Sequence, residues 1–196
     1  PATPELTAVG ITLALLIGVP AGVFSALYRN RWPDQLARGL ALTGVSFPVF
    51  WLALMLQLLL AVSLDLLPIG GRFPAAYKGP ATITGLYTLD FVLARDAEGV
   101  GLALRHLLLP ALCLAVGSVA SITRITRTSV LDVLGRDFIR TSRAMGLPER
   151  VVIGKYVLKN AFIATLTMLG VALTYMLAGS VLVESVFDWP GIGLYA

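Results

Sequence analysis

Long runs of apolar residues, separated by shorter polar stretches, dominate the pattern along this chain. Four windows are apolar for long enough to cross a hydrocarbon core of roughly 30 Å, which takes about 20 helical residues. They cover approximately residues 6–28, 39–62, 107–125 and 161–183. Because these runs are continuously apolar and do not alternate, they favour helices over a transmembrane barrel. The pattern predicts an all-α, polytopic transmembrane bundle, organised as a single domain over residues 1–196.

Composition agrees with this prediction. Hydrophobic residues make up 57% of the chain and charged residues only 13%, and the mean hydropathy of +0.85 lies well outside the range of soluble domains. The one cysteine, Cys113, falls inside the third apolar run, so we expect neither a disulfide framework nor a metal site. The chain is predicted to be an integral membrane protein.

The Lys and Arg residues predict its orientation. The stretch 63–106 carries only four of the 15, and the segment after Glu184 has none. The rest follow the first and third runs: Arg29, Arg31, Arg38, Arg124, Arg127, Arg136, Arg140, Arg143, Arg150, Lys155 and Lys159. By the positive-inside rule, these two connections are cytoplasmic and the long loop at about 63–106 is outside. The net charge of +4 thus reflects topology and contact with anionic lipid, and no nucleic-acid partner is expected.

Within the spans, prolines and small residues predict local features. Pro20, Pro48 and Pro110 are expected to kink or open their helices. Gly18 and Gly22 form a small-xxx-small step, which allows close helix contact; Gly117 and Ser121 form another. The outer loop is rich in turn residues at its start, so we expect it to be structured. It would shape an extracellular mouth, receive a soluble partner, or simply fill the space between helix ends.

The cytoplasmic segment at about 127–160 has the most specific pattern. Residues 132–145 suit a helix that continues out of the membrane, and Gly146 suits a C-cap or tight bend. Pro148 and Glu149 suit the first turn of a second helix. That helix has an apolar face, which is expected to lie on the bilayer or dock into a protein groove.

Residue patterns also bear on two classes of enzyme. Gly154 and Lys155 are followed by Tyr156 and lack the preceding glycine of a phosphate-binding loop, so we expect no nucleotide site. An intramembrane serine protease would need Ser118 and His106, which lie about 18 Å apart on one helix. A secondary transporter or channel is the stronger alternative, although it usually has charged groups inside the membrane. We predict no catalytic residue.

Several motifs carry a family resemblance over nearly the whole chain. The stretch RTSRAMGLPERVVIGKYVLKNA resembles the EAA-type cytoplasmic loop of bacterial ABC importer permeases, in the variant found in the dipeptide, oligopeptide and nickel branch. In the same order, LLPIGGR, HLLLPALCLAVGSVASITRITRTSVLDVL and VLVESVFDWPGIGLYA resemble other segments of that branch. Arg140, Thr141 and Ser142 replace the Glu-Ala-Ala of the wider superfamily, and Lys159 replaces a common proline. The family also has a helix before and another after these residues, which suggests a piece of a longer polypeptide.

The resemblance implies the type I ABC importer fold and a permease in the bacterial or archaeal inner membrane. Its partners would be a second homologous permease, two cytoplasmic ATP-binding subunits and an external substrate-binding protein. ATP and Mg would be bound by the ATPase subunits, with no cofactor in this chain. By resemblance, the ATPase-coupling residues are Arg140, Thr141, Arg143, Ala144, Gly146, Leu147, Pro148, Glu149 and Arg150. Related permeases transport peptides, nickel complexes, glutathione-like compounds and other small solutes, and the residues do not distinguish among these.

Overall fold

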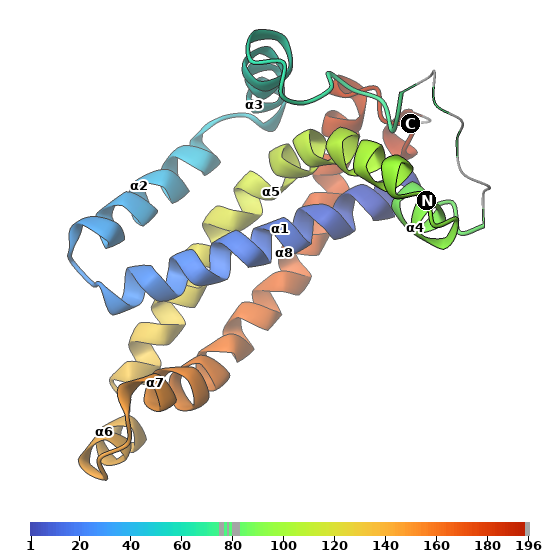
Figure 1. Ribbon diagram of the computed structural model, residues 1–196. Coiled ribbons are helices and arrows are strands. Elements are labelled where there is room, and N and C mark those ends of the chain that lie inside the picture. Colours follow the sequence, from blue (N-terminus) through green and yellow to red (C-terminus); the bar gives the residue numbers. More distant parts are fainter. Residues whose placement is uncertain (75–76, 78, 80–82, 195–196) are drawn as a thin grey trace. The chain divides into compact units, whose positions relative to one another are not determined.

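The computed structural model describes residues 1–74, 77, 79 and 83–194, and within them every regular element is a helix (Figure 1). Three helices are long: α1 (Ala2–Leu27), α5 (Ala97–Leu134) and α8 (Leu158–Val186). The others are α2 (Trp32–Ser46), α3 (Val49–Leu56) with its π-helical continuation Gln57–Ser63, α4 (Tyr87–Leu93), α6 (Asp137–Ala144), α7 (Glu149–Val151) with its π-helical continuation Val152–Val157, and a final 3₁₀ turn, Ile192–Leu194. The all-helical fold class is therefore confirmed.

Three helices are long and apolar enough to span a membrane: α1, α5 and the continuous stretch Glu149–Val186. A fourth span is possible only if α2 and α3 count as one. The helix is interrupted between Ser46 and Val49, where Pro48 adopts an extended conformation at φ −59° and ψ 136°. Proline lacks the N–H that would continue the helix and disfavours helical geometry at the residue before it. The expected opening at Pro48 is thus a complete break.

The chain forms two compact units. The first unit comprises residues 1–13, 47–116 and 173–196, and the second comprises residues 14–46 and 117–172. Each of the three long helices contributes one segment to each unit.

In the second unit, α1 packs closely against α5. A Cβ atom added at Gly22 would lie 2.7 Å from the carbonyl oxygen of Thr123 and from the side chain of Thr126. One added at Gly18 would lie 3.0 Å from Ile122. These separations confirm that the first small-xxx-small step lets two helices approach.

A buried acidic residue ties three helices of the second unit together. The Asp34 side chain, at the start of α2, is fully buried. The Arg127 guanidinium of α5 binds both of its oxygens, with Nε–Oδ1 at 2.8 Å and Nη2–Oδ2 at 2.9 Å. The Ser25 hydroxyl of α1 donates at 2.6 Å and the Asn30 amide at 2.9 Å. Because every lone-pair direction of this carboxylate is engaged, its burial is compensated.

In the first unit, Arg72 plays the corresponding role. Its side chain is largely buried, binds the Glu5 carboxylate and donates to the Gly85 carbonyl at 3.1 Å. Its guanidinium also lies 3.7 Å from the centre of the Tyr87 ring, a cation–π contact. Glu5 in turn accepts hydrogen bonds from the Thr88 amide and hydroxyl, at 2.8 and 2.7 Å. The predicted outer loop is therefore anchored on α1 through a buried ion pair.

The glycines of the LPIGGR motif bring the outer loop onto the end of α8. The Gly71 amide, at φ +75°, donates to the Phe187 carbonyl at 2.9 Å. Gln57 bridges the Ile69 and Val186 carbonyls, at 2.8 and 3.2 Å. His106 Nδ1 lies 3.0 Å from the Gly70 carbonyl oxygen, which gives this histidine a positioning role. The expectation of a structured loop start is confirmed.

The last described segment folds back on its own helix. Glu184 of α8 is fully buried and accepts a 2.7 Å hydrogen bond from the Gly193 amide. The Trp189 indole, also buried, donates to the Ala2 carbonyl at 3.1 Å. The Ile192 amide donates to the Thr3 hydroxyl at 2.9 Å. The motif that follows α8 thus closes onto the start of α1.

Candidate functional site

The connection between α5 and α8, which the charge pattern predicts to be cytoplasmic, consists of two short helices joined by a tight turn. It lies wholly within the second unit. Its first helix, α6, does not continue α5 as the sequence suggested. The α5 helix ends at Leu134, and Arg136 is extended at φ −77° and ψ 149° before α6 begins at Asp137. The Asp137 carboxylate lies in the first turn of α6, where it complements the helix dipole. A separate short helix therefore replaces the expected extension over 132–145.

Gly146 ends α6 in a Schellman motif. Its φ is +78°, in the left-handed region that glycine adopts without a Cβ penalty. The Gly146 amide donates to the Arg143 carbonyl at 2.9 Å, and the Leu147 amide to the Ser142 carbonyl at 3.3 Å. These are the two hydrogen bonds that define the motif. The predicted C-cap is thus confirmed, and the requirement at Gly146 is conformational, since an added Cβ would meet no atom within 4 Å.

Pro148 is the N-cap of the second helix and not its first helical residue, as the sequence predicted. It is extended at φ −64° and ψ 139°, and Glu149 is the first helical residue. The Pro148 carbonyl accepts the first amides of the helix, from Val151 at 2.8 Å and Val152 at 3.2 Å. The predicted position of the proline in the helix is therefore corrected by one residue.

An ion pair joins the two helices across this turn. Arg143 binds Glu149 with both ends of its guanidinium, at 3.1 Å for Nε–Oε2 and 2.5 Å for Nη2–Oε1. The pair holds the pKa of the Arg143 side chain above its ordinary value, the hydrogen bond to Glu149 being the largest cause. About half of each side chain is exposed. Solvent screening keeps the contribution of such pairs small, although the bidentate geometry fixes the turn.

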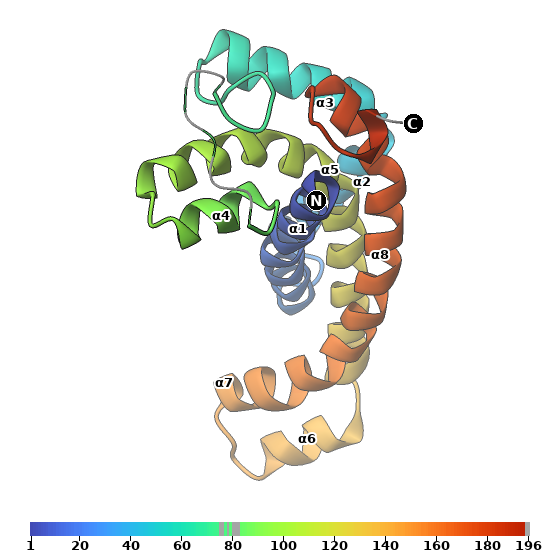
Figure 2. The ribbon, with the colours of Figure 1, turned by 90° about the vertical axis from the view of Figure 1, so that its right-hand side faces the viewer.

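An apolar cluster forms the base of the loop. Ile139, Val152 and Val157 are all fully buried, and Leu147 packs against the same cluster. The cluster continues into Val130, Val133, Ala26 and Ala161, which belong to α5, α1 and α8. Figure 2 shows α6 lying beside the helix that starts at α7, and contacts between α6 and Val152–Val157 agree with this view. Val152 and Val157 of the apolar face thus pack within the chain, whereas Val151 and Ile153 stay half-buried outside the cluster. Contact of this face with the bilayer or with a protein groove stays a prediction.

The predicted coupling residues lie on the exposed side of the loop, over the apolar cluster. All nine lie between Arg140 and Arg150, and all are exposed except Leu147, which is half-buried. Sequence reasoning missed two exposed apolar neighbours, Phe138 and Met145, whose exposed fractions are 39% and 67%. Phe138 lies four residues before the buried Ser142, and Met145, the C-cap of α6, lies three residues after it. Helical spacing therefore groups both with the inward face, and the sequence carries no signal for their exposure. The loop therefore presents a mixed charged and apolar surface on a packed support.

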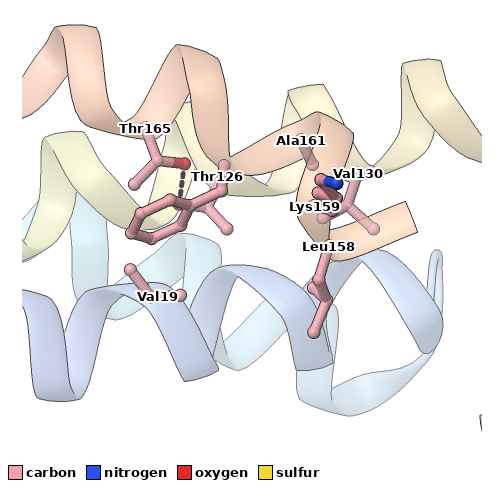
Figure 3. A pocket seen from close by; sticks show the side chains of 8 residues that line it. Val19, Thr126, Val130, Leu158, Lys159, Ala161 and Thr165 are labelled. Atoms are coloured by element: carbon pink, nitrogen blue, oxygen red, sulfur yellow. Dashed lines mark hydrogen bonds between the residues drawn. The ribbon is translucent and has the colours of Figure 1, made fainter. Parts of the chain in front are cut away.

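A cavity of about 330 Å³ lies next to the base of the loop (Figure 3). Val19 of α1, Thr126 and Val130 of α5, and Thr165 of α8 line it, and the Thr126 and Thr165 hydroxyls are 3.0 Å apart. Val130 and Ala161 belong both to this lining and to the apolar cluster. Lys159 is the one titratable group of the described lining. The described lining of this cavity is thus mainly apolar.

Within the described part of the chain, no group of three or more His, Cys, Asp or Glu side chains is placed to hold a metal ion. Gly154 and Lys155 lie in the π-helical segment Val152–Val157. A phosphate-binding loop instead joins a strand to a helix.

Comparison with known proteins identifies the class. Residues 18–196 match the family described as "Binding-protein-dependent transport system inner membrane component", and the chain belongs to that family. It is therefore related to inner membrane components of binding-protein-dependent transport systems, and it has several helices long and apolar enough to span a membrane.

Individual relatives narrow the comparison. The chain is 46% identical over 195 residues to the probable D,D-dipeptide transport system permease protein DdpB of Escherichia coli (strain K12), covering 100% of this chain and 57% of the relative. It is 44% identical to the dipeptide transport system permease protein DppB of Alkalihalophilus pseudofirmus, with 99% and 58% covered. A third relative, 36% identical, is the putrescine export system permease protein SapB of Escherichia coli (strain K12), with 98% and 61% covered. The chain thus spans somewhat more than half the length of these relatives.

Proposed function

We propose that residues 1–196 form the main part of a transmembrane permease domain of an ATP-driven importer for dipeptides or related small peptides. Family membership supports the class, and the names of two relatives, which specify dipeptide transport, support the cargo. The permease would pair with a second homologous permease and receive substrate from an external binding protein. ATP and Mg would be bound and used by two cytoplasmic subunits, and this chain would contribute the path and the coupling surface.

We further propose that residues 140–150 are the contact with the ATP-binding subunit. This assignment is supported by the way the loop packs, with buried apolar side chains on one side and exposed residues on the other. Ile139, Val152 and Val157 bury its apolar side, so the exposed residues around Gly146 stand on a rigid base. A rigid surface transmits a partner's movement as a displacement of the helices that carry it. A flexible loop would instead change its own conformation and leave the membrane helices in place.

Co-purification tests the partners. The full-length protein, tagged and extracted in mild detergent from its native host, is expected to carry an ATP-binding subunit and a second permease, identified by mass spectrometry. Recovery without any ATPase partner would support a secondary transporter instead.

Gly146 tests the coupling assignment. Gly146→Val places a β-branched residue at φ +78°, a conformation that costs of order 1–3 kcal/mol, so we expect loss of substrate-driven ATPase activity in the assembled complex. Gly146→Asn is the matched control, because asparagine tolerates the left-handed region, and it should retain most of the activity. Normal substrate-driven ATPase activity in Gly146→Val would refute the assignment.

The cargo needs its own measurement, because one relative is named for putrescine export. Proteoliposomes containing the complex and its binding protein should accumulate a labelled dipeptide in an ATP-dependent manner. Transport of labelled putrescine in the opposite direction, without dipeptide uptake, would replace the proposed cargo.

A further inference from the structure

A second cavity of the second unit differs in chemistry from the one beside the loop. It has a volume of about 270 Å³ and lies between α2 and α5, with Ser25 of α1 at its edge. Three arginines line it: Arg38 from α2, and Arg124 and Arg127 from α5. Ligand pockets for whole drug-sized molecules start at about 300 Å³, so this cavity suits a headgroup or a small anion.

The cavity has a charged end and an apolar end. Along α2, the lining runs from Arg38 to Leu42 and Val45. Along α5, which runs in the opposite direction with respect to the predicted membrane sides, it runs from Arg127 and Arg124 back to Ala120. On both helices the arginines therefore lie nearer the predicted cytoplasmic end. The large apolar side chains farther from that end, Leu42 and Val45, come from α2, while α5 contributes Ser121 and Ala120 there. This is the polarity of a phospholipid whose headgroup lies at the cytoplasmic interface.

The arginines leave uncompensated positive charge. Asp34 is the acidic group that meets them among the described residues, and its oxygens already bind Arg127. Arg38 Nε lies 3.5 Å from Asp34, and its side chain is half exposed. Arg124 is exposed and makes no ion pair within the described residues. Three guanidinium groups against one carboxylate give a net charge of +2 at the cavity.

We propose that this cavity binds an anionic phospholipid of the cytoplasmic leaflet, with its phosphate at Arg38 and Arg124 and the start of an acyl chain against Leu42 and Val45. Guanidinium groups donate paired N–H groups to phosphate oxygens. Basic cavities between helices on the cytoplasmic side are a recurrent way of recognising anionic headgroups. Arg127 is held by Asp34 and positions the cavity wall.

Native mass spectrometry of the full-length complex, titrated with phosphatidylglycerol or phosphatidylethanolamine, tests the proposal. The wild-type protein should retain phosphatidylglycerol preferentially. Arg124→Gln and Arg38→Gln should each weaken its retention about fivefold, since a basic residue near an anionic surface contributes on the order of 1 kcal/mol. Arg31→Gln is the matched control, because Arg31 is an exposed arginine of the same connection that does not line the cavity. Unchanged melting temperatures would show that all variants fold.

Two further arms identify the source of the anion. Ala41→Phe adds bulk at the apolar part of the lining, so it should weaken retention of a long-chain phosphatidylglycerol while leaving a short-chain analogue unaffected. Inorganic phosphate and a dipeptide at millimolar concentration should not displace the lipid. Equal retention of the two lipids by the wild-type protein, equal loss in Arg31→Gln and Arg124→Gln, or displacement by phosphate or by dipeptide would each overturn the lipid site.

Discussion

The outer loop and the cytoplasmic loop are held in place by different kinds of interaction. In the outer loop, a buried Arg72 meets a buried Glu5, and Asp90 accepts hydrogen bonds from Thr84 and Gly85. Between Asp137 and Val157, the cytoplasmic loop instead rests on buried Ile139, Val152 and Val157, and its ion pairs, Arg140–Asp137 and Arg143–Glu149, are exposed. Removal of one partner from a buried ion pair strongly lowers the free energy of unfolding, because the other charge stays buried without compensation. Substitutions on the exposed side of an apolar cluster leave the buried contacts intact. The cytoplasmic loop therefore keeps its polar residues available for a partner.

The largest effect is expected at Arg72. Arg72→Ala leaves the Glu5 carboxylate buried without its charge partner, which should lower the free energy of unfolding by about 3–5 kcal/mol. Denaturant titration in detergent micelles measures this change. Arg105→Ala, at an exposed arginine of the same unit, is the control and should have little effect. An equally small change in Arg72→Ala would show that the outer loop does not depend on buried charge.

The next largest effect should fall on the base of the cytoplasmic loop. Ile139 is fully buried, and truncation of such a residue to alanine costs about 2–5 kcal/mol. Ile139→Ala should therefore increase hydrogen exchange throughout residues 137–157. The adjacent Phe138→Ala, at a partly exposed side chain, serves as the matched control. Equal exchange in the two variants would contradict the apolar support.

A pH titration separates the two regions further. Hydrogen bonds from Thr84, as the largest cause, and from Gly85 hold the pKa of Asp90 below its ordinary value of 3.8. A group whose folded-state pKa is lowered stabilises the fold above its unfolded value, and this contribution is lost as the pH falls through the lowered pKa. Stability of the first unit should thus decline below about pH 4. Melting curves of Asp90→Asn should decline less over this range; an unchanged decline would assign it to other groups.

The smallest effect is expected at the exposed Arg143–Glu149 ion pair. A double-mutant cycle of Arg143→Ala and Glu149→Ala should give a coupling energy of about 0.2–1 kcal/mol, because solvent screens both side chains. The unfolding midpoint of each variant measures it. A coupling energy several times larger would mean that the cytoplasmic loop also relies on charge.

Sequence reasoning reached the helical class, the three long spans and the left-handed turn at Gly146, because hydrophobic run length and a glycine C-cap are local signals. It missed the break at Gly135 and Arg136, where no proline interrupts the helical pattern. It also missed the Arg72–Glu5 pair, whose members are 67 residues apart. The apolar face of the second helix was recognised, but its partner was not, since long-range packing has no periodic signature.

Two glycines with the same small-xxx-small spacing, Gly22 and Gly117, have different surroundings in the structure. Gly22 contacts the α5 backbone closely, whereas a Cβ at Gly117 would meet no described atom within 4 Å. The two sequence patterns are equivalent, and only the placement of a neighbouring helix separates them. The coupling role of residues 140–150 stays a prediction.

Cross-linking from Ala144 tests that role most directly. Ala144→Cys places a thiol on the exposed side of α6, while the native Cys113 is buried, so a cysteine-reactive cross-linker should join residue 144 to the ATP-binding subunit in the assembled complex. Ser185→Cys, exposed at the other end of the described α8, should give no such product. A product from Ser185→Cys but none from Ala144→Cys would contradict the account.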